Sequence, residues 1–300
     1  MDCFMKCLVT GGKGFIGSHL VKRLREHNYE VLSIDKNFLV SDLRKDGKFS
    51  NRIADIRDYA AMKECMYKVD TVFHLAAESK IGTCVDDPIG ASNTNDHGTC
   101  ILLQAAREAG VKRFVYSSTS AAYGLNESPN VETQANDCLN PYSISKVNGE
   151  NWCKVYNDLY GLKTVILRYF NVYGEGQPTT GQYAPVMGIF MRQENAGQPL
   201  TIVGDGEQRR DFVHVDDVVN ANIMAAIGNQ DDEYYGEVYN VGSGINYSVN
   251  EIAAMISENT TNIPPRPGEC RVTLANCDKI KKAFGWSAKV NLEEWINGKK

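Results

Sequence analysis

A tyrosine and a lysine stand four residues apart in the segment NPYSISKVNGE, which covers 140–150. On a helix this spacing puts Tyr142 and Lys146 on one face, about one turn apart, and Pro141 suits the first turn of such a helix. A free tyrosine titrates near ~10, but a neighbouring ammonium favours the phenolate and lowers that pKa. The pair therefore predicts a proton-transfer site in which the phenol takes a proton from a substrate hydroxyl. Because tyrosine and lysine also occur at this spacing on many helix surfaces, the elements around them decide the interpretation.

Short apolar runs alternate with longer amphipathic segments as far as Phe170. The runs with strand character are 6–10, 30–35, 71–77, 113–118 and 163–170, and the segments with helical spacing are 17–28, 59–68, 98–110 and 143–161. Period-2 and buried strands between helical segments are typical of βαβ units. The alternation predicts an α/β fold with a Rossmann-like, doubly wound parallel sheet.

The segment CLVTGGKGFIGSHL places Gly11, Gly14 and Gly17 three residues apart between a predicted strand and a predicted helix. Glycines let the backbone turn tightly and approach a pyrophosphate, whose charge then lies at the helix N-terminus. Asp35 ends the second predicted strand, where a carboxylate accepts hydrogen bonds from an adenosine ribose and repels a 2′-phosphate. The context predicts a site for NAD rather than NADP, and Lys36 beside the acid weakens that preference slightly.

The pattern changes after Phe170, where a loop-rich stretch to residue 211 holds one amphipathic segment. Strand and helix character returns over 212–241, and the rest mixes short helices with proline-rich loops. We therefore predict an NAD-binding Rossmann domain of 1–170 plus 212–241. The remaining 171–211 plus 242–300 form a smaller, discontinuous α/β lobe for the substrate.

From TGGKGFIG through YSISK to RPGE, the chain resembles the extended short-chain dehydrogenases/reductases. Within that family it is most similar to the nucleotide-sugar 4-epimerases of the UDP-glucose and UDP-N-acetylglucosamine group. The resemblance covers essentially the whole chain. It implies that the sugar C4 hydroxyl is oxidised while hydride passes to NAD, that the 4-keto sugar turns over in the site, and that hydride returns to the opposite face.

The resemblance also implies roles for individual residues. The implied catalytic residues are Thr119, Tyr142 and Lys146. The implied cofactor contacts are Gly11, Gly14, Phe15, Ile16, Gly17, Asp35, Asp55, Ile56, Leu75, Ala76, Ala77, Ser79, Asn95, Ser117, Tyr142, Lys146 and Tyr169. The implied substrate contacts are Ser79, Thr119, Ser120, Asn171, Arg210, Arg266, Glu269 and Thr273. Arginine suits a diphosphate because its planar fork donates two parallel hydrogen bonds.

The residues after Thr119 separate the branches of the family. Sugar 4,6-dehydratases carry Asp-Glu where this chain has Ser120 and Ala121, and glucuronate decarboxylases keep a Glu at the second position. This chain therefore lacks an acidic side chain that each of these two reactions requires. Uronate epimerases are disfavoured because NVYGEGQPTTGQYAPVMGIFM contains no Lys or Arg to bind a carboxylate. A reductase or an epimerase at another carbon remains an alternative, and a non-catalytic NAD-binding regulator ranks last because Tyr142 and Lys146 are both present.

Two positions bear on ligand preference. Thr273 stands where some of these epimerases carry a bulky tyrosine, which suggests room for 2-acetamido sugars. Ser79 stands where some members carry a lysine that contacts the cofactor, so the tightness of NAD retention stays open.

Composition and charge limit the partners. The 300 residues are 43% hydrophobic and 23% charged, with a formal net charge of −5 and no basic stripe, which predicts no nucleic-acid partner. Nine cysteines include no C-x-x-C pair, which predicts reduced thiols and no metal site. No run approaches the ~20 apolar residues that span a bilayer, so we predict a cytoplasmic protein with no membrane contact. The resemblance implies a homodimer through a four-helix interface, with 88–110 and 141–160 as candidate segments.

Overall fold

The computed structural model describes residues 5–180, 185–228, 231–265 and 270–299. The chain forms two compact units, each made of separate stretches of sequence. Unit 1 consists of Met1–Thr119, Asn140–Arg168 and Val219–Tyr239, and unit 2 consists of Ser120–Leu139, Tyr169–Val218 and Asn240–Lys300. This division differs from the predicted domains mainly at 120–139 and 212–218, which the sequence pattern assigns to the NAD-binding domain and which lie in unit 2.

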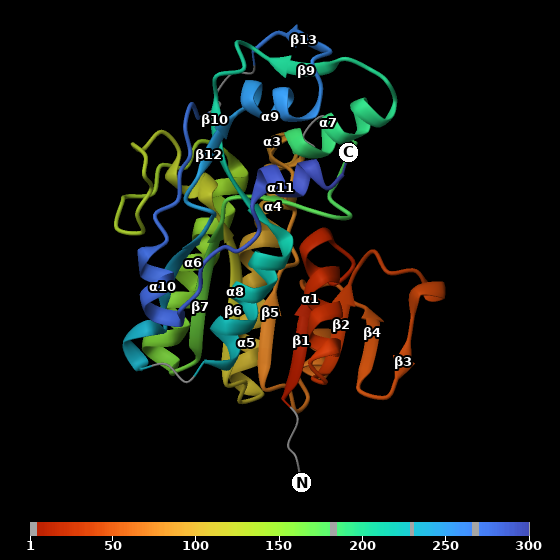
Figure 1. The fold of residues 1–300 in the computed structure, drawn as a ribbon. Coiled ribbons are helices and arrows are strands. Elements are labelled where there is room, and N and C mark those ends of the chain that lie inside the picture. Colours follow the sequence, from red (N-terminus) through yellow and green to blue (C-terminus); the bar gives the residue numbers. More distant parts are fainter. Residues whose placement is uncertain (1–4, 181–184, 229–230, 266–269, 300) are drawn as a thin grey trace. The chain divides into compact units, whose positions relative to one another are not determined.

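A sheet in the order β11-β7-β6-β5-β1-β2-β4-β3 forms the framework of unit 1 (Figure 1). The pairs β1–β2, β1–β5, β2–β4 and β5–β6 are parallel, whereas β3 runs antiparallel to β4 at one edge. The strands are β1 Lys6–Thr10, β2 Glu30–Asp35, β3 Lys45–Asp46, β4 Phe49–Ile53, β5 Thr71–His74, β6 Arg113–Thr119, β7 Lys163–Tyr169 and β11 Glu237–Val241. The predicted Rossmann-like, mostly parallel sheet is confirmed. The strand order reverses between β1 and β5, and such sheets bind ligands at that point, beyond the carboxyl ends of the strands.

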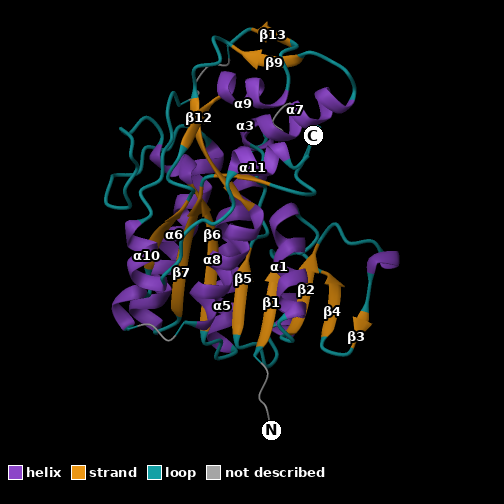
Figure 2. Ribbon diagram, viewed as in Figure 1, coloured by secondary structure: helices purple, strands orange, loops and turns teal. Residues whose placement is uncertain are grey.

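Helices flank this sheet, as Figure 2 shows in purple beside the orange strands. Helix α1 contacts β1 and β2, α6 contacts β6, and α5 contacts both α2 and α6. The helices are α1 Phe15–Glu26, α2 Tyr59–Cys65, α3 Ile81–Asp86, α4 Pro88–Ser92, α5 Gly98–Glu108, α6 Pro141–Tyr160 and α8 Val215–Ile227, the last of which crosses the boundary between the units. Leu8, Ile34, Phe114 and Ile166 belong to the buried core that these elements enclose.

Local sequence explains where α6 begins and ends. The side chain of Asn140 accepts a hydrogen bond from the backbone N–H of Ser143 at 3.0 Å, and Pro141 occupies the first helical position. Gly161 ends the helix with φ +67°, a left-handed conformation that glycine adopts without steric cost. The helix therefore begins at Pro141, as the position of that proline predicts.

Two features of unit 1 differ from the sequence-based expectation. Strand β5 ends at His74, three residues before the predicted end, because the N–H of Ala76 turns to the Thr10 side chain at 3.1 Å. One turn of π-helix, Asn93–His97, joins α4 to α5. Such turns interrupt α-helices and are frequent at functional sites.

Among its described residues, unit 2 contains two small sheets and, besides the start of α8, four α-helices. Strands β12, β10 and β8 form one sheet, and β13 and β9 form the other, where they lie side by side (Figure 2). Its elements are β8 Asn171–Tyr173, α7 Val186–Asn195, β9 Leu200–Val203, β10 Arg209–His214, β12 Asn246–Ser248, α9 Val249–Ile256, β13 Thr260–Ile263, α10 Asp278–Phe284 and α11 Leu292–Asn297. The amphipathic segment predicted within the loop-rich stretch 171–211 is helix α7, whereas the short strands β8, β9 and the start of β10 were not expected there. These strands of three to six residues are too short to show a clear period.

Across the described part of the chain, no helix combines the length and the apolar character needed to cross a bilayer.

Candidate active site

Strand β6 and helix α6 bring the three predicted catalytic residues together within unit 1. Thr119 is the last residue of β6, and its hydroxyl is hydrogen-bonded to the phenol of Tyr142. Tyr142 lies in the first turn of α6, and Lys146 follows one turn later. Thr119 and Lys146 are 8% and 3% exposed, whereas Tyr142 is half-buried. The arrangement joins a hydroxyl, a phenol and an amine in a site that excludes most water.

Burial dominates the charge states of the tyrosine and the lysine. It lowers the pKa of Lys146 to about 7. It also raises the pKa of Tyr142, although the hydrogen bond with Thr119 partly offsets the rise. In the protein alone, burial outweighs any lowering by Lys146, because desolvation disfavours both charged forms. The prediction that the pKa of Tyr142 falls also relies on the positive nicotinamide ring of NAD. A phenolate at neutral pH needs further positive charge beyond that of Lys146.

Tyr116 of β6 contacts both the side chain and the backbone of Lys146. The Lys146 Nζ lies 4.2 Å from the centroid of the Tyr116 ring, within the range of a cation–π contact. The Tyr116 hydroxyl donates to the Lys146 carbonyl at 3.2 Å. Gly149 permits this approach, because a Cβ at that position would overlap the Tyr116 hydroxyl.

The glycine loop connects β1 to α1 in the form that a phosphate site requires. Gly11 has φ +71°, and a Cβ there would lie 2.7 Å from the Ala76 N. Gly14 is the N-cap of α1, and a Cβ on Gly17 would overlap the Gly11 carbonyl oxygen. Phe15 begins the helix. The backbone thus turns tightly beside the loop that follows β5, with Ile16 as the second residue of α1.

Asp35 lies at the end of β2, as predicted, and is already hydrogen-bonded. Its carboxylate accepts from the N–H of Lys13 at 3.1 Å and from the N–H of Asn37 at 2.9 Å. The Lys13 Nζ pairs with Asp42 at 2.7 Å. These contacts connect the glycine loop to the segment after β2, and they fix the Asp35 carboxylate at the carboxyl end of that strand.

The loop after β5 is held by a buried amide. Asn95, which is 1% exposed, accepts from the Glu78 N–H at 2.7 Å and donates to the Glu78 carbonyl at 2.9 Å. It also donates to the Ser145 hydroxyl at 2.9 Å, next to Lys146. Asn95 therefore joins the predicted cofactor loop, which includes Leu75, Ala76, Ala77 and Ser79, to helix α6.

The other predicted cofactor residues are either paired with a charged neighbour or buried. Asp55 pairs with Arg57 at 2.6 Å, and hydrogen bonds from that guanidinium hold the pKa of Asp55 below its usual value. Ile56 is 5% exposed and belongs to the hydrophobic core. Ser117 is buried on β6, and Tyr169 is buried at the end of β7 and belongs to unit 2.

In unit 2, predicted substrate residues gather around Asp211 of β10. The Asn171 amide donates to the Asp211 carbonyl at 2.9 Å, and the Thr273 hydroxyl accepts from the Asp211 N–H at 3.4 Å. Arg210 donates to the Arg209 carbonyl at 2.9 Å. Arg209 pairs with Glu251 on α9 at 2.8 Å, which gives that arginine a structural partner. Ser120 begins a short 3₁₀ turn, Ser120–Tyr123, while the predicted Arg266 and Glu269 lie outside the described residues.

Sequence reasoning missed Asp211 itself, which is fully buried. Its Oδ1 accepts from the N–H and hydroxyl of Ser243 at 2.7 and 2.8 Å, and its Oδ2 accepts from the N–H groups of Gly244 and Ala275 at 2.9 and 3.0 Å. Burial raises the pKa of this carboxyl, and these hydrogen bonds oppose the rise. The available signal was the acid directly after Arg210, in a run that otherwise has strand character.

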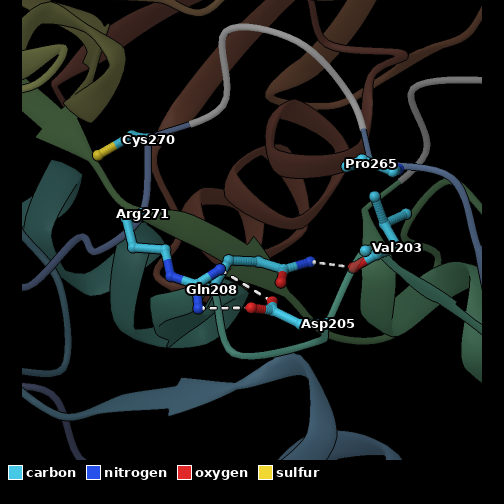
Figure 3. Close-up of a pocket in the computed structure, with 7 residues that line it drawn as sticks. Val203, Asp205, Gln208, Pro265, Cys270 and Arg271 are labelled. Atoms are coloured by element: carbon cyan, nitrogen blue, oxygen red, sulfur yellow. Dashed lines mark hydrogen bonds and ion pairs between the residues drawn. The ribbon is translucent and has the colours of Figure 1, made fainter.

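Unit 2 also contains a pocket between β9, β10 and the chain near Pro265 (Figure 3). Arg271 donates to both oxygens of Asp205 at 2.8 Å, and Gln208 donates to the Val203 carbonyl at 3.1 Å. The remaining lining residues are Gly204, Pro265 and Cys270. The paired charges give this pocket a polar wall.

Comparisons with known proteins agree on one family. Residues 7–242 match the NAD dependent epimerase/dehydratase family. A Methanocaldococcus jannaschii protein, provisionally named a UDP-glucose 4-epimerase, is 38% identical over 96% of this chain and 95% of its own. The UDP-glucose 4-epimerase of Thermotoga maritima, solved with UDP-glucose, has a TM-score of 0.90 and 36% identity over 97% and 96% of the two chains. The UDP-N-acetylglucosamine 4-epimerase of Methanobrevibacter ruminantium has a TM-score of 0.90 and 30% identity over 98% and 96%.

Proposed function

The chain belongs to the NAD dependent epimerase/dehydratase family, and on that premise we propose that it is an isomerase, an NAD-dependent UDP-sugar 4-epimerase. The substrates are UDP-glucose/UDP-galactose, their 2-acetamido counterparts, or both. The observation that carries the proposal is the hydrogen bond between Thr119 and Tyr142, with Lys146 one turn further along the same helix. Ser120 and Ala121 follow Thr119 in place of the acids that an elimination requires.

The residues at the carboxyl ends of β1 and β2 in unit 1 fit NAD. A Cβ on Gly11 would clash with the backbone of Leu75 and Ala76, and one on Gly17 would clash with the backbone of Gly11. These glycines therefore allow the tight turn that lets a backbone approach a pyrophosphate. Asp35 presents a carboxylate at the end of β2, where a ribose is held. NAD⁺ held by these residues would supply the hydride acceptor for oxidation at the sugar C4. We assign the predicted cofactor contacts to this site as a proposal.

The chain's own groups manage the proton. Tyr142 takes the proton of the C4 hydroxyl as the C–H bond breaks and returns it in the reverse step. Thr119 orients the phenol through their hydrogen bond, and the ammonium of Lys146 adds positive charge nearby. Because burial raises the pKa of Tyr142, the phenolate is favoured mainly when a second positive charge is present.

We propose that unit 2 binds the nucleotide and sugar. Asn171, Arg210 and Thr273 lie around β10, and Arg210 carries the charge that a diphosphate needs. Arg266 and Glu269 complete the predicted set. Thr273 leaves more room than a tyrosine, which supports acceptance of an acetamido group.

Location in the cytoplasm and a homodimer are further proposals. Exposed apolar side chains on α4 and α6 support pairing through these helices, notably Ile89 at 74%, Leu159 at 70% and Val155 at 41% exposure. Sedimentation should show a species of twice the chain mass, and a monomer at all concentrations would contradict the dimer.

The deciding experiment is NMR of purified protein with UDP-glucose and, separately, UDP-N-acetylglucosamine, with no cofactor added. Conversion of either sugar to its galacto epimer establishes the reaction and shows that NAD travels with the protein. If neither converts after NAD is supplied, the 4-epimerase proposal is wrong. Net consumption of NADH or NADPH would favour a reductase instead.

A further inference from the structure

Helix α6 carries a third ionisable residue in register with Tyr142 and Lys146. Glu150 follows Lys146 by four residues, so the three side chains share one face of the helix over two turns. Glu150 is 1% exposed, and glutamate is almost never fully buried unless it is paired. Its partners therefore indicate what it does.

The carboxylate of Glu150 joins three elements of unit 1. Arg168 of β7 donates from Nε to Oε1 at 2.8 Å and from Nη2 to Oε2 at 2.7 Å, which is a bidentate, charge-assisted pair. Ser118 of β6 donates its hydroxyl to Oε1 at 2.5 Å. Ser118 directly precedes Thr119, whose hydroxyl bonds Tyr142 two turns earlier on α6. Helix and strand are thus fixed to each other at both ends of the catalytic face.

Lys146 lies between these two attachments. Its Nζ rests over the Tyr116 ring, and its backbone carbonyl accepts from the Tyr116 hydroxyl. The ionisable groups that face it are Tyr142, Glu150 and Cys153 on α6, Tyr116 on β6 and His74 on β5, with Arg168 on β7 behind Glu150.

Charge within this group is unevenly distributed. Burial lowers the pKa of Lys146, and Cys153 and Glu150 act in the opposite direction. Burial also raises the pKa of the Cys153 thiol far above its ordinary value, so that this residue is uncharged where Lys146 titrates. His74 is neutral as well, because burial lowers its pKa well below the ordinary value. Of the two groups that favour the ammonium, Glu150 is the one that is paired with a guanidinium.

We propose that Glu150, clamped by Arg168 and Ser118, is a positioning residue that keeps Lys146 in its ammonium form and fixes helix α6 against the strand that ends in Thr119. The inference rests on the proposed function only for the role that it gives Lys146 in turnover. The charge relation between Glu150 and Lys146 is a property of the folded protein and is measurable without any substrate.

The test is a pH titration of Lys146 by NMR of protein labelled with ¹³C at the lysine ε-carbon, its signal assigned with Lys146→Met. In Glu150→Gln the titration midpoint should fall by about one pH unit, because an opposite charge nearby is worth one to three units. In Arg168→Met it should rise, because the carboxylate then faces the lysine without its partner. Opposite shifts from the two members of one ion pair are not expected of a purely structural bridge.

The matched control removes a different ion pair that also involves a residue of strand β7. Lys163 at the start of β7 pairs with Asp232 at 2.9 Å on the surface. Asp232→Asn should leave the midpoint of Lys146 unchanged. If Glu150→Gln does not fold, Glu150→Gln/Arg168→Met replaces it, since no buried charge is then unpaired, and the midpoint should still fall.

The second measurement is the pH profile of epimerisation, in which the loss of rate at high pH should follow the Lys146 midpoint in each variant. An unchanged midpoint in Glu150→Gln, or in the double variant that replaces it, overturns the proposal. Shifts of the same sign in Glu150→Gln and Arg168→Met also overturn it. If the wild type does not epimerise UDP-sugars, the proposed function fails while the NMR titration still tests the Glu150 inference.

Discussion

Each unit of this protein buries a carboxylate, and the two are satisfied in different ways. Glu150 in unit 1 is bound by a guanidinium and a hydroxyl, whereas Asp211 in unit 2 accepts from three backbone N–H groups and one hydroxyl. The charged partner of Glu150 offsets the cost of burying its carboxylate, which follows Lys146 by one helical turn. Neutral backbone donors instead let Asp211 fix the chain around Ser243 and Ala275, where no regular element does so.

The difference matches the work that we propose for each unit. Regular elements in unit 1 hold reactive groups at fixed spacing, and the buried ion pair controls charge there. Short strands and loops in unit 2 need an internal anchor to present groups for binding. Rate should therefore depend on unit 1, and affinity and selectivity on unit 2.

The largest effect should come from Tyr142→Phe, which removes the proton-transfer group and leaves the ring. We expect kcat to fall about 10³-fold, within the range of general acid–base catalysis. NAD content and the KM for UDP-glucose should change little, because the binding groups remain. Full turnover in this variant, measured by the NMR assay, would contradict the proposal that Tyr142 transfers the proton.

Arg168→Met should destabilise the protein by about 3–5 kcal/mol, because it leaves the buried Glu150 charge unpaired. The double variant Glu150→Gln/Arg168→Met should recover much of that loss, since it removes both charges. Urea unfolding of wild type, single and double variants measures the difference. Equal destabilisation in the single and double variants would mean that packing, and not charge, dominates at this pair.

Asp211→Asn should cost about 2–6 kcal/mol in the same unfolding measurement, because its amide NH₂ would face two N–H donors, each left unsatisfied at about 1–3 kcal/mol. The Lys146 titration should not move. Asp205→Asn is the matched control, since Asp205 is an exposed acid of the same unit paired with Arg271, and its stability should change little. A shift of the Lys146 midpoint in Asp211→Asn would remove the distinction between the two carboxylates.

The sequence predicts unit 1 far better than unit 2, for physical reasons. Regular helical spacing, with Pro141 as the start signal and Gly161 as the stop signal, places Tyr142 and Lys146 on α6. The glycine loop marks the turn between β1 and α1. Glu150 shares that periodicity, but its partner Arg168 comes from a strand whose register no local pattern reveals. The sign of the Tyr142 shift also depends on burial, which spacing does not show.

In unit 2 the informative contacts are long-range. Asp211 bonds Ser243 and Ala275, which lie more than thirty and sixty residues away in sequence. Strands of three or four residues such as β8 and β9 carry too little pattern to be recognised. Loop anchors of this kind become visible only when the chain is folded.

The smallest expected effect is on selectivity and belongs to unit 2. Thr273→Tyr should reduce the ratio of kcat/KM for UDP-N-acetylglucosamine over UDP-glucose by about tenfold, the scale on which a pocket discriminates small steric changes. Thr273→Val is the control: it keeps the size and loses only the weak 3.4 Å hydrogen bond from the Asp211 N–H. Both variants are compared with the two sugars in one NMR assay. A loss that is equal for both sugars would mean that Thr273 supports the β10 backbone rather than the sugar, and selectivity would then have to be sought elsewhere in unit 2.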